Sequence, residues 1–100
     1  MNYSTGNLPS DPQKLLQVGW LDVTPTAMKA SIPSREYYNP QTGIKVRFDP
    51  KTVGAPGFEG VDHYHIYNPN RTSRRDYYLD IRGNPVSKGS KESHILPEDA

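Results

Sequence analysis

Two of the chain's three histidines stand two residues apart, in the stretch 62–68 (DHYHIYN). This stretch is rich in aromatic and β-branched residues and ends at an Asn-Pro-Asn turn signal, so it predicts a β-strand. Alternate side chains of a strand share one face, which places His63, His65 and Tyr67 together, with the two imidazoles about 7 Å apart. Histidine exchanges protons readily near neutral pH. The pair therefore indicates acid–base chemistry, or else two surface histidines on a half-buried strand.

A second strand is predicted at residues 44–49, where apolar residues alternate with Lys45, Arg47 and Asp49. If both strands belong to one sheet, Lys45 and Arg47 join the histidines on one polar face. Such a face suits RNA cleavage. One histidine takes the proton of the ribose 2′-hydroxyl, the other protonates the leaving 5′-oxygen, and a cation stabilises the charge on the phosphate. The 2′-hydroxyl is the nucleophile, so we expect no metal or other cofactor.

The third histidine, His94, is either a further catalytic group or a tail residue packed on the sheet. It also bears on a metal-dependent alternative, because His-x-His is a common ligand spacing that His94 or Asp49 could complete. The spacing from Gly57 to the two paired histidines matches the opening of the cupin motif, but the glutamate that this motif needs next is absent. A metal-dependent nuclease and a non-enzymatic RNA- or protein-binding module are the alternatives.

Basic residues follow the histidine stretch, although the formal net charge of the chain is only +1. Those between 71 and 91 are Arg71, Arg74, Arg75, Arg82, Lys88 and Lys91. A basic patch on a nearly neutral domain fits a phosphate-bearing ligand, or is simply a solvated loop. We expect the turn at 71–75 to hold RNA phosphates and Tyr67 to stack on a base. The predicted RNA-binding set is Arg35, Tyr67, Arg71, Arg74 and Arg75.

Length and composition predict one small domain. The chain has 100 residues, of which 33% are hydrophobic, with ten prolines, eight glycines and no cysteine. The core is therefore small and carries neither disulfides nor thiolate zinc sites. No apolar run reaches membrane-spanning length and no signal peptide is present, so we expect no stable membrane association. Residues 1–9 are expected to be a disordered lead-in, residues 10–97 the domain, and residues 98–100 a tail.

The pattern of elements predicts an α+β fold. Ser10 is expected to cap a helix that ends before Gly19, with Gln13 completing a capping box. A short second helix is expected after Thr24-Pro25. Strands are expected at residues 35–38, 44–49, 62–68 and 76–81, with a short fifth strand at Val86. One or two N-terminal helices would pack on one face of this four- or five-stranded antiparallel sheet, leaving the other face wet and able to carry function.

Several stretches together resemble the C-terminal toxin domains of bacterial polymorphic and contact-dependent growth inhibition systems. They are 34–40 (SREYYNP), 45–49 (KVRFD), 54–60 (GAPGFEG), 62–65 (DHYH), 78–80 (YLD) and 93–97 (SHILP). The resemblance runs from about Leu8 to Pro97. It implies a small α+β fold related to barnase, EndoU, colicin and RelE ribonucleases.

The resemblance also implies an antibacterial endoribonuclease, often directed at tRNA. By analogy, the catalytic positions are His63, His65, Lys45 and Arg47, with His94 as a further candidate. Such a domain is exported at the end of a larger effector and acts in the cytoplasm of the target bacterium. A host elongation factor is a further candidate partner. An immunity protein neutralises the toxin in the producing cell, and we expect it to be acidic and to cover Lys45, Arg47 and the 71–75 turn.

Overall fold

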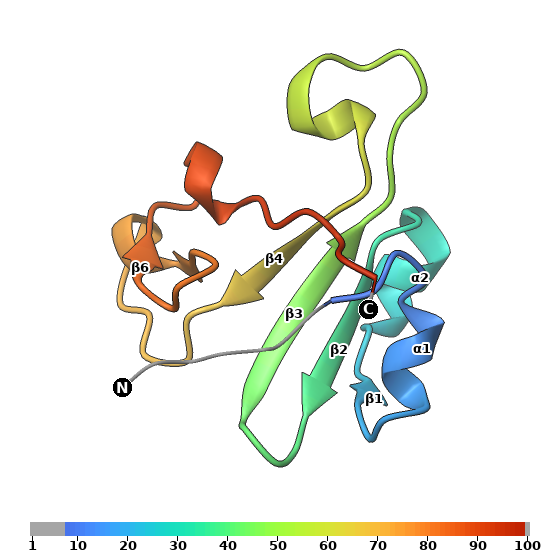
Figure 1. Cartoon of the computed structure of the whole chain (residues 1–100), viewed down its shortest axis with the longest axis horizontal. Helices are drawn as coiled ribbons and strands as arrows, with labels where there is room; N and C mark the ends of the chain where they lie inside the picture. The colour runs from blue at the N-terminus through green and yellow to red at the C-terminus, as the bar shows by residue number, and fades with distance from the viewer. Residues whose placement is uncertain (1–7, 100) are drawn as a thin grey trace.

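The computed structural model describes residues 8–99. These residues form a six-stranded antiparallel sheet in which each strand pairs with its sequence neighbours, with two short helices at one end (Figure 1). The α+β class is therefore confirmed. The helices and strands are α1 (Gln13–Leu16), β1 (Leu21–Asp22), α2 (Thr26–Ser31), β2 (Arg35–Asn39), β3 (Ile44–Asp49), β4 (His63–Tyr67), β5 (Tyr78–Leu79) and β6 (Pro85–Val86). Three single-turn 3-10 helices lie at Gly57–Gly60, Arg74–Asp76 and Lys91–Ser93.

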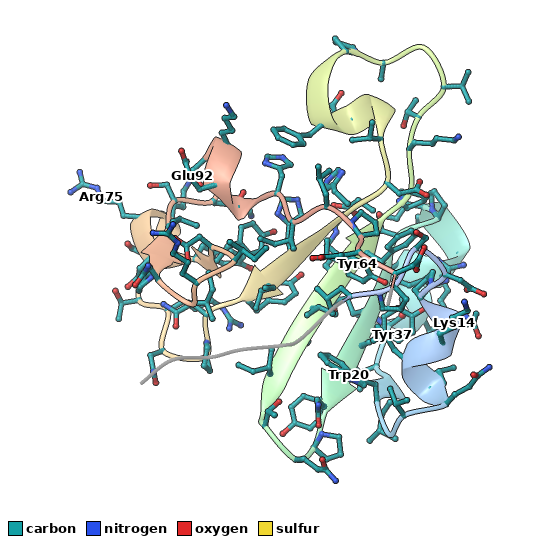
Figure 2. The ribbon with its side chains drawn as sticks, viewed as in Figure 1. Lys14, Trp20, Tyr37, Tyr64, Arg75 and Glu92 are labelled. Carbon is teal, nitrogen blue, oxygen red and sulfur yellow. The ribbon has the colours of Figure 1, made fainter. Side chains whose placement is uncertain are left out.

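The core lies on one face of the sheet. The register pairs Tyr37 with Val46 and Val46 with Ile66, so apolar side chains from the three central strands stack side by side. Leu15 of α1 and Trp20 belong to the same buried cluster. Figure 2 shows Trp20 and Tyr37 lying between α1 and the central strands. Burying large aromatic rings here compensates for the low apolar content of the chain.

The first helix differs from its prediction. It begins at Gln13 after Pro12, and the side chain that accepts the N–H of Gln13, at 3.0 Å, is that of Asp11 rather than Ser10. Ser10 instead donates its hydroxyl hydrogen to Asp99 at 2.7 Å, and the Asp99 carboxylate also accepts the backbone N–H of Ser10. The predicted capping box is therefore wrong, because a tertiary partner from the other end of the chain takes the side chain that would have capped the helix.

The two ends of the described chain lie together, as the blue and red segments of Figure 1 show. Leu8 is only 2% exposed, and the hydroxyl of Tyr64 donates to the carbonyl of Pro9 at 2.6 Å. The N–H of Glu98 donates to the carbonyl of Leu8 at 2.8 Å. Residues 8–9 and 98–99, expected as lead-in and tail, thus contact the domain. The expectation for residues 1–7 and 100 lies outside the described residues.

The strand expected at 76–81 shortens to β5 because aspartates terminate it on both sides. The Asp76 carboxylate accepts hydrogen bonds from the backbone of Thr72 and Ser73 and caps the 3-10 turn before the strand. The Asp80 carboxylate accepts the N–H groups of Arg82 and Asn84 and starts the turn after it. Aspartate often bonds to nearby backbone in this way, in competition with strand pairing. Within residues 8–99 no helix is long and apolar enough to cross a membrane.

Candidate active site

The C-terminal segment brings the third histidine to the other two. Ile95 pairs with Tyr64 of β4 through two backbone hydrogen bonds of 2.8 Å, one in each direction. This bridge directs Ile95 toward the core, so His94 points to the opposite face, where His63 and His65 lie. The ring centroids of the three histidines are 4.8–5.0 Å apart.

Asp49, at the end of β3, is the centre of this cluster. Its Oδ1 accepts hydrogen bonds from Ser34 Oγ at 2.6 Å and from Arg47 Nε at 2.8 Å. Its Oδ2 lies 3.5 Å from His63 Nε2 and 3.4 Å from His65 Nε2. The cross-strand pairing of Asp49 with His63, and of Arg47 with His65, produces this arrangement. One carboxylate therefore joins two imidazoles and a guanidinium.

Backbone carbonyls determine which ring nitrogen of each histidine is free. The Nδ1 atoms of His63, His65 and His94 each lie 3.0 Å from a carbonyl oxygen, those of Val61, Ser93 and Ser90 respectively. A carbonyl can only accept, so each Nδ1 must carry the hydrogen and donate it. Each Nε2 is then the nitrogen that exchanges a proton or binds a ligand.

The environments of the two β4 histidines shift their pKa values in opposite directions. Burial alone would lower the pKa of His63, but the hydrogen bond to Asp49, the bond to Val61 and the Asp49 charge outweigh it and raise the pKa above 6.5. For His65, burial dominates the attraction of Asp49 and lowers the pKa from 6.5 to about 4. The two environments therefore favour the charged form of His63 and the neutral form of His65.

The Asp49 carboxylate stays ionised. Burial alone would raise its pKa, but hydrogen bonds from His63, Ser34 and Arg47 outweigh burial and hold the pKa well below its ordinary range. A charged carboxylate at this position is what favours the charged form of His63.

Two aromatic rings fix the orientation of the imidazoles. Tyr78 of β5 stacks on His65 at 4.5 Å between centroids. Phe58, from the 3-10 turn of the loop between β3 and β4, stacks on His94 at 4.5 Å with 14° between the rings. That loop is held by the N–H of Lys51 on the Asp62 carboxylate and the N–H of Thr52 on the Glu59 carbonyl. The imidazoles are thus positioned before any ligand arrives.

The cluster borders a hollow of about 500 Å³, lined among others by Ser34, Arg47, Asp49 and the three histidines. The rest of the wall comes from residues 32–33 before β2 and from the loop between β3 and β4. The predicted wet face is therefore wrong in detail. Both faces of β4 are buried, and His63 and His65 line this hollow rather than an open face of the sheet.

The same three histidines satisfy the geometry of a metal-binding cluster. Their ligand atoms all lie within 4.8 Å of one another. Metal-binding histidines usually donate their second ring N–H to a carbonyl or carboxylate, as these three do. Such a donor set fits an ion that prefers imidazole, such as Zn²⁺. The guanidinium of Arg47, bonded to Asp49 beside the cluster, opposes a second cation and favours an anion.

The remaining predicted site residues do not all join this cluster. Lys45 lies farther along β3, where its Nζ is 3.7 Å from Glu36 and 4.5 Å from the centre of the Tyr67 ring. Tyr67 is buried and donates its hydroxyl hydrogen to Glu36, so its ring is not open for stacking on a base. Arg35 is in register with Phe48, on the core face, and its guanidinium donates to the carbonyls of Ile32 and Ser34.

The predicted basic turn lies at another part of the surface. Arg74 and Arg75 are exposed on the 3-10 turn before β5, and Figure 2 shows Arg75 projecting outward at the edge of the molecule. Arg71 lies 5.5 Å from the ring of Tyr67 and 5.3 Å from that of Tyr77. None of the three is among the residues that line the hollow.

Sequence reasoning considered Asp49 only as a metal ligand and missed its central role, although its alternation with Lys45 and Arg47 already placed it on the polar face. It also missed the supporting Ser34, Phe58 and Tyr78, whose contacts come from other elements.

In comparisons with known proteins, no family model matches the chain, and neither a curated protein nor a solved structure does. The function is therefore argued from the chain's own geometry.

Proposed function

We propose that the protein is an endoribonuclease that cleaves RNA by histidine acid–base catalysis without a metal. One observation carries the proposal. The Nε2 atoms of His63 and His65 flank the same oxygen of Asp49, in a hollow that also contains the guanidinium of Arg47. A base, an acid and a cation are sufficient for RNA, because its 2′-hydroxyl supplies the nucleophile.

The opposed pKa shifts assign the two roles. Neutral His65 takes the proton of the 2′-hydroxyl through Nε2 as the 2′-oxygen attacks phosphorus. The bond from phosphorus to the 5′-oxygen breaks, and charged His63 gives its Nε2 proton to that leaving oxygen. The products are a 2′,3′-cyclic phosphate and a free 5′-hydroxyl. Arg47 lies where it can stabilise the negative charge that builds on the phosphate, and Asp49 accepts the Nε2 hydrogen of charged His63.

The experiment is cleavage of total RNA by the purified protein in excess chelator. We expect cleavage to persist and to leave 2′,3′-cyclic phosphate ends. A doubly substituted His63→Ala/His65→Ala protein, purified in parallel, controls for contaminating ribonuclease and should be inactive. Activity that disappears in chelator and returns with Zn²⁺ or another imidazole-binding ion would instead make the three histidines metal ligands. RNA that is bound with a strong salt dependence but left intact would indicate a binding module.

The cellular setting is proposed from the resemblance to exported toxin domains. We infer that tRNA is the substrate, that the target bacterium's cytoplasm is where it is cut, and that a host elongation factor is a candidate for presenting it. Sequencing the RNA ends after cleavage of total cellular RNA tests the first point. An enrichment of new ends within tRNA supports it, whereas ends spread evenly over all RNA contradict it.

An acidic immunity protein is the proposed partner. Of the residues that this partner is expected to cover, Lys45 and Arg47 already face Glu36 and Asp49 within the chain, whereas Arg74 and Arg75 are exposed. Complementary charge there would speed association and orient the partner. Unchanged affinity and unchanged salt dependence after Arg74→Glu/Arg75→Glu would rule out binding at this basic surface.

A further inference from the structure

A second hollow, of about 520 Å³, adjoins the candidate active site. The two hollows share one residue, His94, which lines both. The second one lies between the turn that follows β5 and the C-terminal segment that carries His94. A polynucleotide whose phosphate occupies the first hollow therefore has a neighbouring group within reach of the second.

The walls of this second hollow include large apolar side chains that face solvent. Ile81 is 71% exposed and Leu96 is 55% exposed, and Pro97 continues the same surface. Leaving such side chains in water forgoes the free energy that burying them would give. Concave sites with apolar walls and a few polar groups are typical of ligand sites.

The charges around this hollow exclude one class of occupant. Three carboxylates, those of Asp80, Glu92 and Glu98, line it together with a single guanidinium, that of Arg82. An excess of negative charge repels a phosphate. Carboxylates accept hydrogen bonds but donate none, so they favour a group that offers N–H donors. A flat, partly apolar ring with N–H groups on its edge fits both the walls and the charges.

We propose that this second hollow binds the nucleobase adjacent to the cleaved phosphate and makes cleavage base-selective. The inference rests on the proposed ribonuclease function. The base stacks on Ile81 and Leu96, and its edge donates to a carboxylate. Asp80 already accepts the N–H groups of Arg82 and Asn84, and Glu98 is four residues from His94 along the chain, so the base contact is assigned to Glu92, which is two residues from it. Figure 2 shows Glu92 on the turn that leads into this segment.

The assignment predicts which bases are preferred. Guanine offers two neighbouring donors, N1–H and its 2-amino group, which can bind the two oxygens of the Glu92 carboxylate. Adenine and cytosine can donate from an exocyclic amino group and uracil from N3–H, so each of these three makes one such bond. One hydrogen bond contributes about 0.5–1.5 kcal/mol, or about a 2- to 10-fold preference. We expect guanine to be favoured over the other three bases by about this factor.

The first test uses nucleosides, which have no phosphate and need no catalysis. Adenosine, cytidine, guanosine and uridine are titrated into the protein while the methyl NMR signals of Ile81 and Leu96 are followed. We expect saturable shifts at both residues, with guanosine the strongest ligand. Ile81→Ala should weaken binding by about fourfold, the worth of about one buried methylene group. Glu92→Gln, which keeps only one accepting oxygen, should remove the preference for guanosine. Val18→Ala, an exposed aliphatic residue that lines neither hollow, is the matched control.

The second test measures cleavage of dinucleotides that differ in one base. A preference for guanine on one side of the phosphate that Glu92→Gln removes supports the inference. No nucleoside shift at Ile81 or Leu96, or an equal effect of the Val18 control, overturns it. The proposed function fails separately: if no RNA is cleaved, the ribonuclease is contradicted, while the nucleoside titration still decides whether the hollow binds a base.

Discussion

The same face of the sheet carries two clusters, each built around a carboxylate, a ring and a cation. At one end, Asp49 lies beside His63, His65 and Arg47, and we call this group the Asp49 cluster. At the other end, Glu36 lies beside Tyr67 and Lys45, and we call this group the Glu36 cluster. The Asp49 cluster borders a hollow, whereas the Glu36 side chain is only 8% exposed against 20% for Asp49. Burial and the bond to Glu36 raise the pKa of Tyr67 far above neutrality, so its proton stays in place.

The comparison shows why one cluster can exchange protons with a substrate and the other only stabilises the fold. Both carboxylates are paired with proton donors at short range. Only the histidines, whose rings take up and release protons more readily than a tyrosine hydroxyl does, line a hollow that a substrate can enter, so only their protons can be exchanged with it. Four predictions test whether the Asp49 cluster exchanges protons with a substrate while the Glu36 cluster only stabilises the fold.

The largest effect is expected in the Asp49 cluster. His63→Ala and His65→Ala should each lower the rate of RNA cleavage by about 10²–10⁴-fold, because each removes one acid or base. The measurement is the single-turnover cleavage rate, with circular dichroism to confirm folding. Cleavage at the wild-type rate by both folded variants would place the active site elsewhere.

The Glu36 cluster should respond in stability rather than in activity. Tyr67→Phe removes a hydrogen bond to a charged carboxylate, so the free energy of unfolding should fall by about 1.5–3 kcal/mol. The cleavage rate of the folded variant should be unchanged. Denaturant unfolding gives the first value and the cleavage assay the second. The control is Tyr38→Phe, whose hydroxyl makes no hydrogen bond within residues 8–99. A rate loss in Tyr67→Phe as large as in the histidine variants would erase the distinction between the clusters.

The pH dependence of cleavage sharpens the assignment of acid and base. His65 must be neutral, so cleavage should rise as the pH increases through its pKa of about 4. His63 must be charged, so cleavage should fall as the pH increases through its pKa, which lies above 6.5. The profile is therefore a bell with its plateau between these limits, measured as kcat/KM for a short RNA. A single rising limb that persists to alkaline pH would contradict the role of His63 as the acid.

The smallest effect is expected at the exposed arginines, outside both clusters. Arg74→Ala should weaken RNA binding by a few-fold. It should also reduce the slope of log affinity against log salt concentration by about one, as expected for one lost phosphate contact. The cleavage rate at saturating RNA should not change. Binding measured against salt concentration by fluorescence anisotropy tests this. If saturating rates fall as far as binding does, Arg74 acts in the chemical step and the basic turn belongs to the Asp49 cluster.

The strands of the Asp49 cluster could be predicted from sequence because alternation is a local signal. β3 begins and ends where the pattern of residues 44–49 predicted, and β4 lies within the predicted stretch 62–68. Their shared face followed from the same alternation. Side-chain contacts between distant segments were not predictable in this way. Nothing near His94 in the sequence shows that Ile95 will pair with Tyr64, and this pairing is what brings His94 to the other two histidines.

The elements that were predicted poorly are short and depend on tertiary contacts. β1, which was not predicted, has two residues, too few to show an alternating pattern. The proposed cap of α1 was lost to Asp99, which is 89 positions away in the chain. Lys45 and Arg47 lie on the same face of β3, yet Lys45 belongs to the Glu36 cluster and Arg47 to the Asp49 cluster. The reason is that their partners, Glu36 and Asp49, lie at different positions on the sheet.

The pairing of Ile95 with Tyr64 has a consequence for the order in which the protein is made. The ribosome produces the whole sheet before it produces His94 and Ile95, and a nascent chain folds only from what has emerged. Until Ile95 has emerged and paired, His65 lacks the Ser93 carbonyl that fixes its ring, and the third imidazole is missing. Before that point in synthesis, a growing chain has the strands of the sheet but not the complete histidine cluster.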